Sequence, residues 1–171
     1  MRKAVLVPML CLLSFTVPHG AVARAGQAHL LDRVAIEDLI ATYLYRLDHG
    51  GTASLADLFT ADGVFETISG QKRGRAAISA YYAKRSITRT TRHVSTNRYI
   101  VFDDDTHAHG VYTLTYYMAE GTPPFPASAP AGIADYAEKF ERGEDGKWRF
   151  SYRKATPVFG FAAEALPVPR K

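Results

Sequence analysis

Cysteine is almost absent from this sequence of 171 residues. The single thiol, Cys11, lies in an apolar run near the N-terminus, and the small residues that precede a lipidated cysteine are missing. If that N-terminal segment is removed, the mature chain has no thiol. Disulfide bonds, cysteine nucleophiles and zinc–thiolate sites are then excluded.

A hydrophobic run long enough to span a bilayer is also missing from the N-terminus. The apolar stretch Ala4 to Val17 is too short for a membrane helix, and it follows a short basic start. The small residues of GAVARAG then offer cleavage after Ala23 or Ala25. This order is typical of a secretory signal peptide, so we expect a leader over residues 1–25 and a periplasmic or secreted protein with no stable membrane span. A retained membrane anchor is the alternative.

The mature chain has little excess charge of either sign. The sequence holds 21 Lys and Arg against 17 Asp and Glu. Arg2, Lys3 and Arg24 belong to the expected leader, and without them 18 bases face 17 acids, a net charge of +1. This balance gives no indication of a nucleic-acid partner. A local cluster of Lys84, Arg85, Arg89 and Arg92 can attract an anionic group, but a solvated face is the simpler interpretation.

Helical patterns occupy the first part of the mature chain. Between His29 and His49 apolar residues recur every three or four positions, and Gly50-Gly51 ends the pattern. Ser54 to Asp57 has the form of a capping box, which predicts a short second helix through Phe59. Asp62-Gly63 predicts a turn into a strand over Val64–Ile68, and Gly74 begins a third helix with Ile78, Tyr81 and Tyr82 on its inner side.

A period of two replaces the helical period after residue 91. Arg92–Phe102 and Thr106–Met118 predict a hairpin around a turn of three aspartates, and Ala134–Arg142 and Lys147–Lys154 predict a second hairpin. The Pro- and Ala-rich segment GTPPFPASAPAG between them predicts an exposed loop. Helices followed by a run of antiparallel strands predict an α+β fold, in which a curved sheet wraps over the helices.

This order of elements resembles the SnoaL-like group of the nuclear transport factor 2-like superfamily, with the related scytalone dehydratase and bile acid 7α-dehydratase. The resemblance rests on YLYRLDHGG with LADLFTADGVFE, on RHVSTN, on DYAEKFER and on DGKWRFSYRKA. It covers most of Leu30 to Ala155, so we assign residues 26–156 to the domain and residues 157–171 to a C-terminal tail. The resemblance implies a cone-shaped fold that encloses an apolar pocket for a small molecule.

The resemblance also implies three catalytic residues. In the related dehydratases an aspartate at the position of Asp48 orients a histidine at that of His93, and Tyr43 matches a tyrosine five residues before the aspartate. A carboxylate that fixes the imidazole tautomer makes the histidine a better base. The alternatives remain open: Asp48 as a cap for the loop after Gly50, and His93 as an ordinary core or surface histidine.

Further residues are candidates for substrate binding. In the expected strand His93, Ser95 and Asn97 share one face, so Asn97 either binds a substrate oxygen or satisfies the sheet backbone. A hairpin that is regular about Asp104 places Thr115 opposite His93, where scytalone dehydratase has a second catalytic histidine. Tyr45 is an alternative to Tyr43 for polarising an oxygen. Phe59 and Trp148 complete the expected set.

Metal and cofactor sites have weak signals. His107 and His109 form a His-x-His pair after three aspartates, but the expected register places His109 near Tyr99, roughly 20 Å along the strand from His93. Two ligands are a weak indication of a metal site, so we expect a solvated strand start. No Gly-rich phosphate loop or Ser-His-Asp arrangement can be identified, and we expect no cofactor.

Two classes of function follow from these observations. The first is a cofactor-independent lyase or isomerase, of dehydratase or cyclase type, acting on a small, mostly apolar, oxygenated molecule. The second is a non-catalytic binding or dimerisation domain of the same fold. An open cavity with Asp48 in contact with His93 favours the enzyme, and a filled cone favours the binding domain. The apolar alternate face of the central strand, Val94, Ile100 and Phe102, predicts a homodimer.

Overall fold

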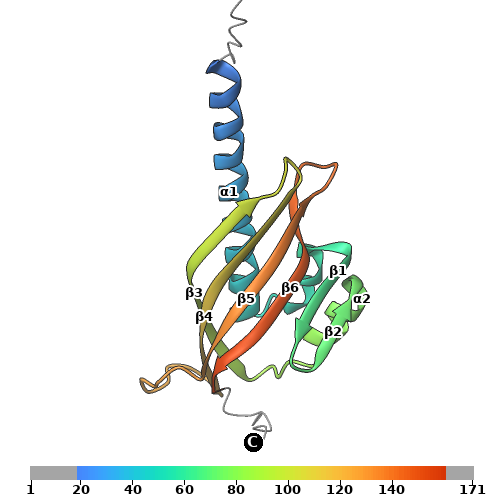
Figure 1. Ribbon diagram of the computed structural model, residues 1–171. Coiled ribbons are helices and arrows are strands. Elements are labelled where there is room, and N and C mark those ends of the chain that lie inside the picture. The colour runs from blue at the N-terminus through green and yellow to red at the C-terminus, as the bar shows by residue number, and fades with distance from the viewer. Residues whose placement is uncertain (1–18, 161–171) are drawn as a thin grey trace, which may run out of the picture.

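One long helix and one sheet make up most of the molecule (Figure 1). The computed structural model describes residues 19–160, with side chains described from His29 onward. Helix α1 (His19–Asp48) lies behind the sheet and extends beyond one end of it, and the short helix α2 (Gly74–Tyr82) lies beside β1 (Phe59–Thr67) and β2 (Gly70–Arg73). The predicted α+β architecture is confirmed.

The sheet has six strands in the order β2-β1-β6-β5-β4-β3. The remaining strands are β3 (Arg89–Phe102), β4 (His107–Glu120), β5 (Gly132–Arg142) and β6 (Trp148–Phe159). All neighbouring pairs are antiparallel except β1 with β6, which is parallel. Both predicted hairpins are present, with longer strands than the alternation indicated. Within residues 19–160 no helix is long and apolar enough to cross a membrane.

Helix α1 packs one apolar stripe against the sheet and ends where the sequence predicts. The stripe residues are all buried: Ile36, Ile40, Tyr43, Leu44 and Leu47. Gly50 has a φ of 83°, and the Gly51 amide donates to the Arg46 carbonyl at 2.7 Å. This is the backbone pattern of a Schellman motif, which favours glycine because of the positive φ. The motif makes Asp48 the last residue of the helix.

The segment after α1 differs from the prediction. Two short 3₁₀ turns, η1 (Thr52–Ser54) and η2 (Ala56–Leu58), replace the expected α-helix. The Ser54 hydroxyl donates to the Gly51 carbonyl at 3.0 Å and caps no helix amide, so the capping box does not form. Asp62 and Gly63 lie inside β1, where its register with β6 shifts, and are not a turn before it. Strand β2 was not predicted.

A bulge in β3 changes which residues face the core. The register of β3 with β4 shifts between Thr96 and Tyr99, and Asn97 has a positive φ of 56°. On the side of the bulge away from the turn, His93 pairs with Tyr116, and Thr115 pairs with Val94. After the bulge Ile100 is buried, whereas Tyr99 is 65% exposed. The prediction of one uninterrupted face from His93 through Asn97 to Tyr99 is wrong because one extra residue reverses the alternation.

Because of this bulge, the apolar surface that was expected to support a dimer does not form as predicted. Ile100 is buried in the core, and Phe102 packs against it. Of the three apolar residues assigned to the outer face, only Val94 is exposed.

Candidate functional site

A cavity of about 460 Å³ opens between the helices and the concave face of the sheet. Its walls come from both helices and from all strands except β2, and they combine aromatic and aliphatic side chains with a few polar groups. The lining residues that matter most here are Tyr43, Leu47, Tyr82, His93, Leu114, Tyr116 and Tyr136. A largely apolar cavity of this size with few polar groups is typical of a small-molecule site.

Asp48 and His93 meet at the wall of this cavity. The His93 Nδ1–H donates to Asp48 Oδ1 at 2.6 Å, and the His93 backbone amide donates to Asp48 Oδ2 at 2.8 Å. Both side chains are more than nine-tenths buried. The contact that the sequence predicted is therefore present. Since Nδ1 is engaged by the carboxylate, the neutral ring has Nε2 as its proton-accepting nitrogen.

Two further side chains hold Asp48 in place. The buried Thr91 hydroxyl donates to Asp48 Oδ1 at 2.7 Å, and Arg85 Nη2 donates to Thr91 Oγ1 at 2.5 Å. Burial works to raise the pKa of Asp48, but the contacts with His93 and Thr91 outweigh it and lower that pKa below the usual value. Asp48 is thus an ionised carboxylate near neutral pH.

Three tyrosines line the cavity together with His93. Tyr43 and Tyr82 share a hydrogen bond between their hydroxyl groups, and burial raises the pKa of both phenols. The Tyr116 ring lies against the His93 imidazole, with 4.8 Å between ring centroids. Both residues line the cavity, and a phenol with a raised pKa keeps its proton at neutral pH. One of the two hydroxyl groups donates to the other, so the pair has one O–H left to donate.

A buried ion pair supports the cavity from behind. The Arg153 guanidinium lies over the Tyr43 ring, 3.7 Å from its centroid, and pairs with Glu138 at 3.0 Å. Arg153 also donates to the Tyr112 hydroxyl at 2.6 Å. Burial raises the pKa of Glu138 to about 6, against the attraction of Arg153. This pair was not predicted, because nothing in the alternating pattern of β5 and β6 distinguishes Glu138 and Arg153 from exposed charges.

The structure brings together the three predicted catalytic residues but not the predicted substrate-binding set. Tyr43 and His93 line the cavity and Asp48 lies against His93. Tyr45 is 65% exposed and stacks on His49, outside the cavity. Asn97 is exposed in the β3 bulge, and Thr115 faces away with Val94.

Phe59 and Trp148 are core residues. Phe59 is fully buried among Tyr43, Phe65 and Phe150. Trp148 donates through Nε1 to Asp32 Oδ1 at 2.9 Å, and neither residue lines the cavity. Aromatic character alone predicted a binding role for them, and it does not distinguish a cavity wall from a core.

Sequence reasoning missed three residues of the site. Thr91 precedes His93 by two positions, so the period of the strand alone places it on the same face. Tyr116 replaces Thr115 opposite His93 because the hairpin register differs by one residue from the regular one. Arg85 belongs to the predicted basic cluster, but its contact with Thr91 depends on the course of the segment that joins α2 to β3.

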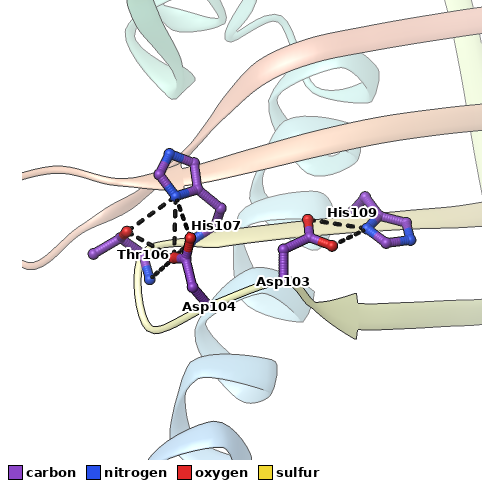
Figure 2. Close-up of polar contacts among 5 residues, drawn as sticks. All are labelled: Asp103, Asp104, Thr106, His107 and His109. Carbon is purple, nitrogen blue, oxygen red and sulfur yellow. Dashed lines mark hydrogen bonds and ion pairs between the residues drawn. The ribbon is translucent and has the colours of Figure 1, made fainter.

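The other histidine cluster lies at the β3–β4 turn, remote from the cavity. Figure 2 shows two separate pairs: His107 Nδ1 contacts Asp104 at 3.0 Å, and His109 Nδ1 contacts Asp103 at 2.8 Å. Both pairs are about half exposed. His109 pairs with Val101 in the sheet, not near Tyr99. Over the part of the chain that the structure describes, no three His, Cys, Asp or Glu side chains gather as metal ligands.

Several solved structures share this fold. A putative scytalone dehydratase from Novosphingobium aromaticivorans is 21% identical, with a TM-score of 0.65 over 82% of this chain and 99% of that chain. A nuclear transport factor 2-like protein with a cystatin-like fold, from the same organism, is 20% identical, with a TM-score of 0.67 over 89% of this chain and 95% of that chain. A hexachlorocyclohexane dehydrochlorinase is 19% identical, with a TM-score of 0.66 over 84% of this chain and 98% of that chain. At these identities the likeness shows the fold alone.

No curated protein matches the sequence. The model of the SnoaL-like domain, however, matches residues 28–154, which is most of the chain and includes every residue of the cavity except Ala155 and Pro157. The match agrees with the helix-and-sheet cone, with the cavity and with the motifs that carry Asp48 and His93. The chain therefore belongs to the SnoaL-like domain family.

Proposed function

We propose that this protein is a cofactor-independent lyase or isomerase that removes a proton from a small, mostly apolar, oxygenated substrate. The observation that carries the proposal is the contact between the Asp48 carboxylate and His93 Nδ1 at the wall of an open cavity. A buried histidine oriented by a carboxylate is the usual form of a general base. Two of the similar folds belong to a putative dehydratase and a dehydrochlorinase, whose names denote eliminations.

The geometry suggests a division of roles. His93 Nε2 accepts a proton from the carbon beside a carbonyl group or an activating ring, and Asp48 stabilises the imidazolium that forms. Tyr43, or Tyr82 through their shared hydrogen bond, donates to the oxygen on which negative charge develops. Elimination of water, migration of a double bond and aldol-type cyclisation all begin with this step, so the proposal names the class of reaction and not the product.

Two substitutions test the proposal. A panel of cyclic β-hydroxy ketones, incubated with the protein in D₂O, reports α-proton removal by deuterium incorporation in NMR and elimination by enone absorbance. His93→Ala should abolish both signals. Asp48→Asn keeps the shape but favours the wrong tautomer, so turnover should fall by about 10²–10⁴-fold. The double variant should lose little more than either single change, since the pair acts as a unit.

Matched controls exist in the same chain. His49→Ala and Asp57→Asn remove an exposed histidine and an exposed carboxylate outside the cavity, and both should leave the rates unchanged. If the wild type binds members of the panel but shows neither exchange nor elimination, a non-catalytic binding domain replaces the enzyme as the better proposal. If Asp48 only caps the loop after Gly50, Asp48→Asn should lower the stability and leave the activity per folded molecule unchanged.

We further propose that the protein is exported. The support is the composition of the leader in residues 1–25, most of which lies outside the described residues.

A further inference from the structure

The mouth of the cavity is cationic. Lys84 and Arg85, directly after α2, and Arg89, at the start of β3, all contribute to its lining. Among the lining residues that the structure describes, none is an aspartate or glutamate. The fourth member of the basic cluster, Arg92, does not line the cavity and donates to the Thr91 carbonyl at 2.6 Å. Three of the four cations of that cluster therefore line the cavity, and two of the three, Lys84 and Arg89, are also exposed to solvent.

These cations lie close to the dyad. The Tyr116 ring contacts His93, and burial raises the pKa of the Tyr116 phenol while the positive charges of Arg85 and Arg89 oppose that rise. Arg85 and Arg89 line the same cavity as Tyr116 and His93, and Arg85 is linked to the dyad through Thr91. Arg85 is fixed by its bond to Thr91, and Arg89 contacts Glu120 through Nε. Lys84 is exposed at the same mouth.

We infer that the substrate carries an acidic group, a carboxylate or a phosphate, which binds to Lys84 and Arg89 at the cavity mouth while its reacting carbon lies beside His93. This inference rests on the proposed function and adds the substrate class. A guanidinium and an ammonium together match the charge and the hydrogen-bonding oxygens of such a group. A cleft lined by charges of one sign with apolar walls also concentrates oppositely charged ligands. The apolar walls, including Leu47, Phe65 and Leu114, then hold the body of the molecule.

Arg85 has a different part in this arrangement. Its guanidinium donates to the Thr91 hydroxyl, which in turn donates to Asp48. Replacing Arg85 would disturb the dyad as well as the mouth, so Arg85 is unsuitable for a binding test. Among the described residues, Arg89 has Glu120 as its ion-pair partner, and neither Lys84 nor Arg89 makes a hydrogen bond or ion pair with Asp48, Thr91 or His93. Their replacement therefore separates anion binding from proton transfer.

The test compares three probes that share a ring system: 2-naphthoate, its neutral analogue 2-naphthamide, and 2-naphthyl phosphate. Isothermal titration calorimetry at low salt should show the wild type binding at least one of the two acids about tenfold more tightly than the amide. Raising the salt concentration should weaken acid binding and leave amide binding unchanged. The acid that binds more tightly identifies the head group as a carboxylate or a phosphate.

Charge-matched variants locate the site. Lys84→Gln with Arg89→Gln should remove the preference for the acid. Lys139→Gln with Lys147→Gln removes the same charge from exposed positions outside the cavity and should keep the preference. Lys84→Arg with Arg89→Lys should keep it too, which separates loss of charge from loss of fold. Equal affinity for acids and amide in the wild type, failure of all three probes to bind, or an unchanged preference in the Lys84/Arg89 glutamine variant would each overturn the inference.

The same titrations in His93→Ala separate this inference from the proposed function. The acid preference should survive in that variant, because the cations and not the imidazole bind the head group. Loss of turnover with retained acid preference supports both statements. If the protein prefers the acids but catalyses no proton exchange, the inferred anion site stands and the proposed enzymatic function is wrong.

Discussion

Asp48 occupies a position that the helix does not favour. As the last residue of α1, its carboxylate lies at the negative end of the helix dipole. Three donors compensate it: the Thr91 hydroxyl, the His93 amide and the His93 Nδ1–H. A residue that is locally unfavourable and yet fully satisfied by distant groups is typical of a functional site.

The lowered pKa of Asp48 predicts how the free energy of unfolding decreases at acid pH. Its pKa is lowered in the folded state, so the unfolded chain binds more protons than the folded one between the two pKa values. The contribution of Asp48 is therefore present above its unfolded pKa and is lost as the pH falls through the folded one. Urea unfolding from pH 6 to pH 2 should show a shallower loss of stability for Asp48→Asn than for the wild type. Equal slopes for both proteins would contradict the carboxylate's role.

Thr91 is expected to act as a positioning residue. Thr91→Val keeps the volume but removes the hydroxyl that links Arg85 to Asp48. We expect the free energy of unfolding to fall by about 1–3 kcal/mol, because Asp48 loses a buried donor. Turnover should fall by about tenfold with a shifted pH profile of kcat, since the base is oriented less firmly. Thr96→Val, at an exposed position of the same strand, is the control and should change neither quantity.

At the scale of elements, the bulge in β3 decides which side chains reach the cavity. Asn97 holds the left-handed conformation on which the bulge depends. Asn97→Gly should leave stability within about 0.5 kcal/mol, because glycine adopts a positive φ without steric cost. Asn97→Val should cost about 1–2 kcal/mol, since a β-branched residue is strained there. Thermal unfolding measures both changes, and equal costs would show that the asparagine side chain, not its backbone conformation, matters.

Strands β5 and β6 are joined by the buried pair of Glu138 and Arg153. Glu138→Gln leaves the guanidinium charge unpaired, and the expected loss is about 3–5 kcal/mol at pH 7, because arginine does not give up its proton. Arg153→Met leaves Glu138 unpaired, but that carboxyl can become neutral by binding a proton. Burial already raises its pKa, so the folded variant binds more protons than the unfolded chain, and its stability must fall as the pH rises.

The measurement is denaturant unfolding at pH 5 and pH 7. The cost of Arg153→Met should be clearly smaller at pH 5. That of Glu138→Gln should be larger at pH 5, because the raised pKa of Glu138 makes the wild type more stable there than at pH 7. Glu144→Gln, an exposed change in the β5–β6 turn, is the control. A pH-independent cost for Arg153→Met would mean that Glu138 stays ionised in its buried position.

At the scale of the whole molecule, a homodimer through the outer face of the sheet remains a prediction. Its basis is now a different set of residues: Val94, Tyr99 and Val111 are each 48% exposed or more, and Tyr99 pairs with Val111 across β3 and β4. Light scattering at tens of micromolar should give the mass of a dimer. Val111→Lys should shift it to a monomer, whereas Val34→Lys, at an exposed position of α1, should not. A monomeric wild type contradicts the prediction.

Export is the other prediction at this scale. Mass spectrometry of the protein from its native host should show a chain that begins at Gly26, without the basic and apolar segments of the leader. Recovery of an intact chain with Met1 from the cytosol would exclude a cleaved leader.

The sequence by itself determined the elements whose signals are local. The apolar stripe of α1, its end at Gly50-Gly51 and the two hairpins follow from periodicity and glycine chemistry, and all are present. The dyad followed from the family motifs that carry Asp48 and His93. Only the tertiary structure decided the rest, because a shift of one residue in β3 reverses every later side chain, and no local pattern records it. The register of the β3–β4 turn together with this shift places Tyr116, not Thr115, opposite His93. The packing of α2 beside the sheet is likewise a contact between distant segments. It places Lys84 and Arg85, which the sequence presents as part of a surface cluster, at the mouth of the cavity.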